Sequence, residues 1–456
     1  MPWIPHSPEE VREMLARIGV ASIDELFDEI PAGLRSDRPL QLPPAMNEAA
    51  VSRLMLERSL GDTPLLCFAG GGAYEHHVPA TVWELAGRGE FYTAYTPYQA
   101  EASQGTMQVI YEYQSMMCQL LAMEVSNASL YDGATALAEA ILMAVRANRR
   151  SRSRRVLLPR NIHPVYRQVA RTLVTAQELE LVEVPFDPAT GLLDPQTVAA
   201  MAGEECAAVV IPQPDYFGGI EPVDELVRAV APSGALVVGL VNPLAMALLR
   251  PPGQWGGAEG VDIACGEAQS LGLPLSSGGP YLGFLCCRER HVRQMPGRLV
   301  GRTVDDEGQP AFALTLQARE QHIRRSRATS NICTNQGLMM TAATIHMALM
   351  GGAGLRRAAA ASHRATVELV EALTSLPGVE PLFDRLFFHE TVLRLPLPPA
   401  RVLEALEGHG ILGGIDLSRA YPELGDALLV CATELRTGED IESYRCALGR
   451  VLEQAA

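Results

Sequence analysis

The amino-acid sequence predicts an α/β protein in which a mainly parallel, doubly wound sheet is followed by a smaller C-terminal α+β domain. Between residues 127 and 242, short apolar segments typical of buried strands alternate with helical segments. From about residue 329 the order changes to long helices followed by short strands. The 456 residues, 48% of them hydrophobic, are enough for a large core. We therefore predict an N-terminal arm at 1–63, a large domain at 64–328 and a small domain at 329–456.

The predicted arm begins with a helix signal. Ser7 is a suitable N-cap for a first turn that holds Pro8, Glu9 and Glu10, and the amphipathic pattern continues through Ile18. A proline-rich connector follows, with Pro31, Pro39, Pro43 and Pro44. We expect such a segment to wrap around a neighbouring chain.

The large domain is predicted element by element. The apolar run LLCFAGGGAY at 65–74 leads into a glycine turn, and the aromatic segment EFYTAYTPYQAEASQG at 90–105 predicts a loop that covers a site. Helices are predicted at 106–123 and from 134 through 149. The following elements are, in order, the strand RVLLP at 155–159, a helix from 163, the strand LELVEVPF at 179–186, a helix from 195, the strand CAAVVIPQP at 206–214, a helix from 223 and the strand GALVVGLVN at 234–242. Alternation at this spacing predicts a mainly parallel sheet with helices on both faces. In the small domain we predict helices at 336–350 and 355–374 and a strand within FFHETVLRL at 387–395.

Composition and charge exclude several classes of function. The formal net charge is −16, whereas nucleic acids and anionic membranes require a basic face. The nine cysteines form no CxxC pair and are interpreted as reduced core thiols. The N-terminal residues show no signal-peptide pattern, and the longest apolar stretch, 235–249, is too short to span a bilayer. We expect a cytoplasmic protein without a nucleic-acid or membrane partner.

The stretch VDIACGEAQSLGLPLSSGGPYLGF at 261–284 has the layout of a cofactor-anchoring loop. An apolar strand at 261–265 leads into a loop, and the glycine-rich turn at Gly278 and Gly279 is followed by a second apolar strand at 281–286. In enzymes that bind pyridoxal phosphate covalently on a doubly wound sheet, the lysine lies between two such strands. All 37 residues in the combined Lys and Arg count are arginines, so the sequence contains no lysine. Arginine stays protonated and cannot form the imine.

Two further positions correspond to places where a cofactor would be held. Asp132, Gly133 and Thr135 lie at a glycine turn that feeds a helix N-terminus, which is a favourable place for a phosphate group. The alternative is that Asp132 simply caps that helix, since its negative charge opposes a phosphate dianion. Asn242 ends the strand 234–242, where a carboxylate would pair with a pyridinium nitrogen, and it is equally interpreted as a structural strand-end residue.

The remaining candidates have simpler alternatives. His76 and His77 are adjacent on an extended segment and point to opposite faces, which disfavours a metal site. Ser103 has no identifiable partners for a nucleophilic triad. Two basic clusters could bind an anionic group or could be solvated helix ends. They consist of Arg149, Arg150, Arg152, Arg154 and Arg155, and of Arg319, His322, Arg324, Arg325 and Arg327.

Several long segments resemble one known family over essentially the whole chain. They are MPWIPHSPEEVREML, GGGAYEHHVPA, GEFYTAYTPYQAEASQGT, SNASLYDGATALAEA, LPLSSGGPYLGF and EQHIRRSRATSNICTNQ. Together they resemble the first subunit of the glycine cleavage P-protein, glycine dehydrogenase (decarboxylating, aminomethyl-transferring), in organisms that split this enzyme into two chains. The resemblance implies a pyridoxal-phosphate transferase fold like that of aspartate aminotransferase (fold type I). It also implies a sister chain that alone keeps the lysine.

Aligned on that catalytic sister chain, two cofactor contacts are replaced here. The sister's His-Lys-Thr run falls on 268–270, which places Gln269 at the lysine position. Its pyridinium aspartate falls on Asn242. The resemblance therefore implies no catalytic residue and no cofactor in this chain, with pyridoxal phosphate on the partner subunit. Asp132, Gly133 and Thr135 would be a relic of the phosphate loop.

The resemblance implies that the heteromeric enzyme decarboxylates glycine and transfers the aminomethyl group to the lipoyl group of the H-protein. This chain would be inactive alone and would support an active site at the subunit interface. The segments expected to approach the sister's cofactor or channel are Tyr95, Thr96, Pro97, Tyr98, Gln99, Ser103, Gln104, Arg325, Ser330 and Asn331. The alternatives are a purely structural scaffold subunit and an enzyme that uses unattached pyridoxamine phosphate without a lysine.

Overall fold

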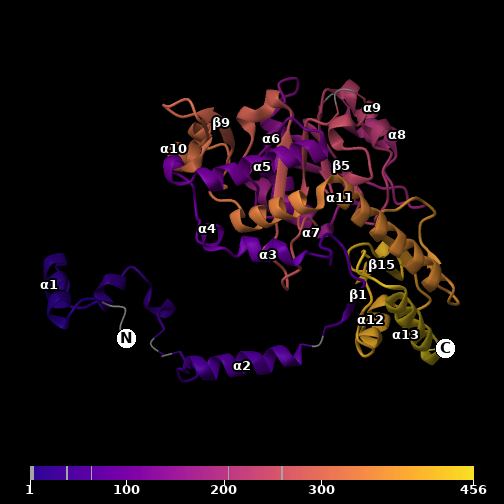
Figure 1. Ribbon diagram of the computed structural model, residues 1–456, viewed down its shortest axis with the longest axis horizontal. Helices are drawn as coiled ribbons and strands as arrows, with labels where there is room; N and C mark the ends of the chain where they lie inside the picture. Colours follow the sequence, from indigo (N-terminus) through magenta and orange to yellow (C-terminus); the bar gives the residue numbers. More distant parts are fainter. Residues whose placement is uncertain are drawn as a thin grey trace. The chain divides into compact units, whose positions relative to one another are not determined.

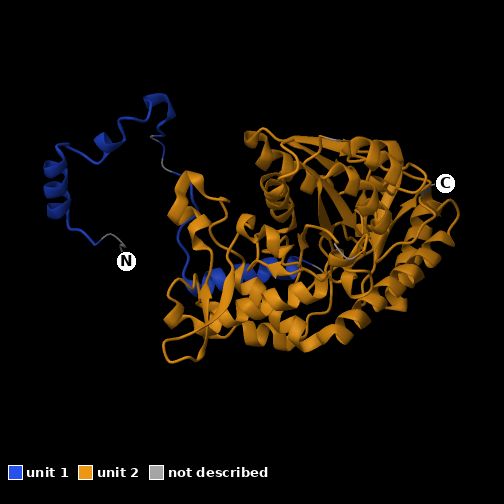
Figure 2. Ribbon diagram, turned by 90° about the horizontal axis from the view of Figure 1, so that it is seen from above, with its two compact units in different colours: residues 1–63 blue, residues 64–456 orange. Residues whose placement is uncertain are grey.

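The computed structural model describes residues 5–36, 38, 40–62, 64–203, 205–257 and 260–455. The chain divides into two compact units, 1–63 and 64–456, which Figure 2 shows in different colours. The predicted boundary between 328 and 329 does not coincide with a division into units and stays a prediction.

Unit 1 contains helices α1 (Pro8–Ile18) and α2 (Glu48–Gly61), separated by two short 3-10 turns. Helix α1 has the predicted bounds because Ser7 forms a capping box with Glu10 and Gly19 ends the helix in a left-handed conformation. Helix α2, capped by Asn47, was not predicted. Neither helix has a buried residue.

A seven-stranded sheet forms the centre of unit 2 (Figure 1), with the strand order β2-β8-β7-β6-β5-β3-β4. Strands β7, β6, β5, β3 and β4 are parallel, and β8 and β2 extend the sheet with antiparallel pairings. The predicted mainly parallel α/β sheet is therefore confirmed. The strands are β2 (Val125–Ser126), β3 (Arg155–Pro159), β4 (Glu180–Val184), β5 (Ala208–Gln213), β6 (Leu236–Val241), β7 (Ile263–Glu267) and β8 (Gly283–Cys287).

Helices cover both faces of this sheet because the buried strands are apolar on both sides. Helices α6 and α7 contribute to one core cluster, and α5, α8, α9 and α11 contribute to the other. Their bounds, with those of the short helices of this region, are α3 (Ala80–Ala86), α4 (Gly89–Tyr92), α5 (Gln104–Leu121), α6 (Gly133–Ala147), α7 (Pro164–Val174), α8 (Pro195–Ala202), α9 (Val223–Val230) and α10 (Gln321–Arg324). A hairpin of β9 (Val300–Val304) and β10 (Pro310–Leu314) was not predicted.

Helix α11 (Gly337–Thr374) joins the two helices that we predicted as separate elements. Gly351, with φ 56° and ψ 177°, is not helical, so a break separates the two helices between residues 350 and 355 as predicted. Among the described helices, α11 is the one long and apolar enough to cross a membrane, but 56% of its most apolar window is buried inside the protein. That burial is typical of a core helix.

The C-terminal residues form a four-stranded sheet of order β11-β12-β15-β14 with helices beside it. Its core cluster contains Leu369 and Leu373 from α11, together with Leu393, Leu428 and Leu448. The elements are β11 (Glu380–Pro381), β12 (Glu390–Arg394), α12 (Pro399–Glu407), β14 (Ile415–Asp416), β15 (Ala427–Cys431) and α13 (Gly438–Ala455). A separate short pair joins β1 (Leu66–Cys67) to β13 (Ile411–Leu412).

Candidate functional site

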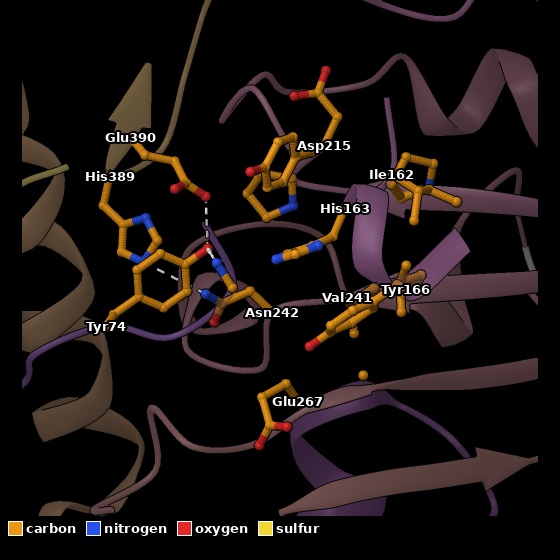
Figure 3. A pocket seen from close by; sticks show the side chains of 16 residues that line it. Tyr74, Ile162, His163, Tyr166, Asp215, Val241, Asn242, Glu267, His389 and Glu390 are labelled. Carbon is orange, nitrogen blue, oxygen red and sulfur yellow. Dashed lines mark hydrogen bonds between the residues drawn. The ribbon is translucent and has the colours of Figure 1, made fainter. Parts of the chain in front are cut away.

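A cavity of about 80 Å³ lies at the carboxyl ends of the central strands (Figure 3). Strands β5, β6 and β7 end at this cavity, which is the edge where open α/β sheets bind ligands. The start of α7 and the start of β12 close its other sides. The lining residues are Gly72, Tyr74, Ile162, His163, Tyr166, Pro212, Pro214, Asp215, Tyr216, Leu240, Val241, Asn242, Gly266, Glu267, His389 and Glu390.

The carboxylate of Glu267 lies at the N-terminus of α6. Its Oε2 accepts a hydrogen bond from the Gly133 N–H at 2.9 Å. Its Oε1 accepts from the N–H groups of Gln269 at 2.9 Å and Leu282 at 2.8 Å. Burial raises the pKa of Glu267 to about 7, although these hydrogen bonds act in the opposite direction. The Glu267 carboxylate therefore occupies the place at the N-terminus of α6 where a bound anion would lie.

Asp132 caps the same helix. Its Oδ1 accepts from the Thr135 N–H at 2.8 Å, and the Thr135 hydroxyl lies 3.2 Å from the Asp132 N–H in a capping box. Two carboxylates, Asp132 and Glu267, therefore lie near one helix terminus. This arrangement corresponds to the capping alternative for Asp132 and leaves little favourable potential for a further anion.

Gln269, at the expected lysine position, is 1% exposed and fully engaged by backbone groups. Its Oε1 accepts from the Tyr74 N–H at 2.9 Å. Its Nε2 donates to the Tyr74 carbonyl at 2.9 Å and the Leu273 carbonyl at 2.7 Å. The amide therefore ties two distant segments together instead of pointing a reactive group into the cavity.

Asn242, at the expected pyridinium-aspartate position, lines the cavity at the end of β6. Its Oδ1 accepts from the Leu244 N–H at 2.9 Å and so stabilises the following turn. Its Nδ2 lies 3.5 Å from Nε2 of His389. An amide in this environment supplies no negative charge to a protonated ring.

His163 begins α7 and lies over the cavity (Figure 3). Its ring stacks on Tyr166, with centroids 4.9 Å apart and planes inclined by 19°, and lies 4.8 Å from the ring of Tyr216. Burial lowers its pKa to about 4, so His163 is neutral at physiological pH. The His163 ring is therefore held between two tyrosine rings at the edge of the cavity.

A second buried carboxylate, Glu390, closes the cavity from β12. Tyr74 donates its hydroxyl proton to Glu390 at 2.6 Å, and the Gly71 N–H donates at 2.8 Å. Burial raises the pKa of Glu390 to about 7. One dashed line in Figure 3 joins the Tyr74 hydroxyl to this carboxylate.

A third group of buried charges lies at the turn after β5. Asp215 pairs with Arg385 at 3.0 Å, and both side chains are almost fully buried. Asn161 donates to Asp215 at 3.2 Å and to Glu221 at 2.6 Å, which joins the two carboxylates. Burial raises the pKa of Glu221 to about 8. This cluster fixes the turn rather than offering free groups to a ligand.

The residues at the cavity do not fit pyridoxal phosphate. Gln269 replaces the amine, Asn242 replaces the carboxylate, and Glu267 occupies the N–H groups that a phosphate would need. Glu267 and Gln269 lie at the end of β7, and Asn242 follows the end of the neighbouring strand β6. We therefore derive no chemistry from this cofactor in this chain.

Arg298, which is 2% exposed, joins the expected segment 95–99 to residues that follow the expected Ser330 and Asn331. Its guanidinium donates to the Thr96 hydroxyl at 3.2 Å and the Cys333 carbonyl at 2.8 Å. It also lies 5.5 Å from the centre of the Tyr98 ring, which in turn contacts His322 at 5.4 Å. We name this arrangement the Arg298 surface, comprising residues 95–99, Arg298, His322 and residues 330–335.

The other interface candidates are placed as follows. Tyr95 is 83% exposed and Tyr98 is 48% exposed, whereas Pro97 is buried. Gln104 is structural in its contacts, because its amide exchanges hydrogen bonds with the backbone of Phe312 in β10 at 2.8 and 2.9 Å. Gln99, Arg325 and Asn331 are exposed, and Ser103 and Ser330 are half-buried. None of these candidates lines the cavity.

The remaining sequence candidates lie elsewhere. His76 and the His77 N–H both bind Glu434, at 2.8 and 2.7 Å. Within the described residues, no group of three or more His, Cys, Asp or Glu side chains is placed to hold a metal ion. The two basic clusters contribute to two further cavities, of about 740 Å³ and about 330 Å³. Arg149 and Arg150 line the first, and Arg319, Arg324 and Arg327 line the second.

Sequence reasoning missed most of the cavity: Tyr74, His163, Tyr166, Asp215, Glu267, His389 and Glu390. For Glu267 a signal was available, since it is the sole charged residue between Asp262 and Arg288 and ends an apolar strand. A carboxylate at that edge of a parallel sheet faces the ligand position. His389 and Glu390 carry no such signal, because their strand belongs to another sheet.

The chain has the fold of fold type I pyridoxal-phosphate-dependent enzymes. It resembles a sphingosine-1-phosphate lyase of Burkholderia pseudomallei, with a TM-score of 0.66 at 15% identity over 92% of this chain and 94% of that chain. It also resembles a glutamate decarboxylase of Lactobacillus brevis, with a TM-score of 0.68 at 12% identity over 93% and 97%. At these identities only the fold is shared.

The sequence profile of the glycine cleavage system P-protein matches residues 1–447, and the chain belongs to this family. A "Probable glycine dehydrogenase (decarboxylating) subunit 1" of Thioalkalivibrio sulfidiphilus is 60% identical over 97% of this chain and 98% of that protein. A protein of the same name from Nitrosomonas europaea is 58% identical over all of both chains. A crystal structure of a glycine decarboxylase (P-protein) in inhibitor-bound form matches with a TM-score of 0.85 and 41% identity, covering 99% of this chain and 100% of that chain. The family and the fold type expected from the sequence are confirmed.

Proposed function

We propose that this chain is the supporting subunit of a split glycine decarboxylase and that a sister subunit carries pyridoxal phosphate. Together the two chains decarboxylate glycine and transfer the aminomethyl group to the lipoyl group of the H-protein. The observation that supports this most strongly is Gln269, whose amide is held by three backbone hydrogen bonds at the lysine position. Pyridoxal phosphate, when bound to the sister chain, supplies the electron sink for decarboxylation. The complex works in the cytoplasm.

The Arg298 surface is the part of this chain that we propose to face the sister's active site. In symmetric or pseudo-symmetric pairs, one chain's loops complete the site of the other. Tyr95, Tyr98 and Asn331 are all exposed and offer aromatic and polar groups that could position a substrate and exclude water. Arg298 holds the segments 95–99 and 330–335 in place, because its guanidinium donates hydrogen bonds to both Thr96 and Cys333.

The test is reconstitution with the sister subunit and the lipoylated H-protein, with glycine–bicarbonate exchange as the measured rate. We expect exchange from the two chains together and none from this chain alone. Glycine-dependent carbon dioxide release by the isolated chain would contradict the proposal. A visible absorption band of the isolated chain with added pyridoxamine phosphate would favour the lysine-free enzyme instead.

Replacing two residues of the Arg298 surface separates a contribution to the channel from a scaffold contact. We expect Tyr98→Ala with Asn331→Ala to lower the exchange rate at saturating partner by about tenfold or more, since positioning is lost. The dissociation constant between the chains should change by about threefold or less, because rim contacts contribute little affinity. Both quantities are measured on the same preparation.

The matched control is Tyr92→Ala, which removes an equally large tyrosine, 69% exposed, outside the Arg298 surface. It should leave the rate at saturating partner unchanged. If the double variant weakens assembly but turns over normally when fully assembled, the chain is a scaffold. In that case the proposed site residues are wrong.

A further inference from the structure

We infer that Glu267 acts as an internal anion, which occupies the phosphate position of this chain's former cofactor site and excludes phosphate-bearing ligands from it. The inference rests on the proposed function in one respect, namely that the cavity descends from a cofactor site. It goes further by assigning the exclusion to one side chain. The missing lysine alone would not prevent a phosphate group from binding.

The hydrogen-bond geometry around Glu267 is that of a built anion site. Three backbone N–H groups converge on its two oxygens from three segments: Gly133 at the start of α6, Gln269 after β7 and Leu282 before β8. Backbone N–H groups at a helix N-terminus are the usual donors to phosphate in proteins. Here each of the three is satisfied by a carboxylate of the same chain.

The N-terminus of α6 packs tightly against Glu267. A methyl group added at Gly133 would lie 2.6 Å from the Tyr166 hydroxyl and 2.9 Å from Cβ of Glu267. Glu267 also forms part of the wall of the 80 Å³ cavity. A phosphate group therefore has access to the three N–H groups only if the Glu267 carboxylate leaves them.

Repulsion between negative charges also disfavours a phosphate group at this helix end. Asp132 lies close enough to Glu267 to raise its pKa, so a phosphate dianion would meet two carboxylates at one helix end. The positive end of the α6 dipole is already used by these groups. Removing the Glu267 side chain frees the three donors, leaves the Asp132 cap in place and extends the cavity towards α6.

The experiment is a calorimetric titration of inorganic phosphate into the full chain without its sister subunit, at constant ionic strength. We expect Glu267→Ala to bind phosphate about tenfold or more tighter than the unmodified chain, because three N–H groups lose their acceptor. Glu267→Gln retains the shape of the side chain but cannot accept from all three donors. It should bind phosphate more tightly than the unmodified chain and more weakly than Glu267→Ala.

The matched control is Glu390→Gln, which neutralises another buried carboxylate of the same cavity without freeing the N-terminus of α6. It should bind phosphate as weakly as the unmodified chain. Equal gains from Glu390→Gln and Glu267→Ala would overturn the inference, since a general charge effect would then be responsible. The inference would also be overturned if neither Glu267 variant bound phosphate more tightly than the unmodified chain. If Glu267→Ala does not fold, the result for Glu267→Gln alone tests the inference. Turnover of the reconstituted complex is measured in a separate assay. The phosphate titration therefore tests only the role of Glu267, and the turnover assay tests only the proposed function.

Discussion

Replacing Gln269 by lysine is expected to destabilise the chain by about 3 kcal/mol and to give the isolated chain no glycine decarboxylase activity. Lysine can still donate to the carbonyls of Tyr74 and Leu273, but it offers no acceptor to the Tyr74 N–H. The ammonium group would be buried at a position that is 1% exposed. The other two departures, Asn242 and Glu267, would remain.

The measurement combines urea unfolding of the full-length variant with glycine-dependent carbon dioxide release. Gln269→Met is the matched control, since it has a similar length and removes the hydrogen bonds without burying a charge. It should show the cost of the lost bonds alone. A Gln269→Lys chain that is as stable as the original, or that releases carbon dioxide without its sister, would refute the interpretation of Gln269.

The second large effect is expected at Arg385. Arg385→Ala should lower the free energy of unfolding by about 3–5 kcal/mol, because it leaves the buried Asp215 carboxylate without its cation. Asp215 and Glu221 are also joined through Asn161, so two acids would share the uncompensated site. Urea unfolding at constant temperature measures the loss.

The loss should depend on pH in a definite direction. Burial raises the pKa of Glu221 to about 8 and also raises that of Asp215. A raised pKa means that the folded state binds more protons than the unfolded state, so stability falls as pH rises through this range. Without Arg385 both pKa values rise further. The defect of Arg385→Ala should therefore be larger at about pH 8 than at about pH 5.

A double variant provides the control for this site. Arg385→Ala with Asp215→Asn removes the carboxylate together with its cationic partner. The loss in free energy of unfolding of this double variant should therefore be smaller than the sum of the losses of the two single variants. Additive losses would show that Asp215 and Arg385 do not stabilise each other. The pH dependence should also become weaker in the double variant, since one acid fewer titrates.

Much of the fold was predictable because local signals agreed with the tertiary structure. The strand Arg155–Pro159 and the helix Pro164–Val174 follow directly from an apolar run and from proline at a first helical turn. The hairpin at 300–314 was missed because its strands are only partly buried and lack a clean alternation. Helix α2 was missed because the proline-rich connector before it dominated the interpretation of the arm.

The candidate site was less predictable. Gln269 and Asn242 were identified by resemblance, and both lie at the expected edge of the sheet. Their partners were not identified, because Tyr74 and Glu390 are 316 positions apart in the sequence yet share a hydrogen bond. Gln104, which we expect in the channel segment, also exchanges hydrogen bonds with the backbone of Phe312 in β10, 208 positions away in the sequence. Sequence spacing carries no information about such contacts.

Helix α11 links the folding of the two cores in unit 2. Met340, Met347 and Leu355 pack in the core of the large sheet, and Leu369 and Leu373 pack in the C-terminal core. After Gly351 the helix continues without a break to Thr374. The segment from Leu355 to Leu373 therefore contributes side chains to both cores. Each of the two cores is incomplete without this one segment. We therefore expect the two cores to unfold together, although the sequence pattern predicts two domains.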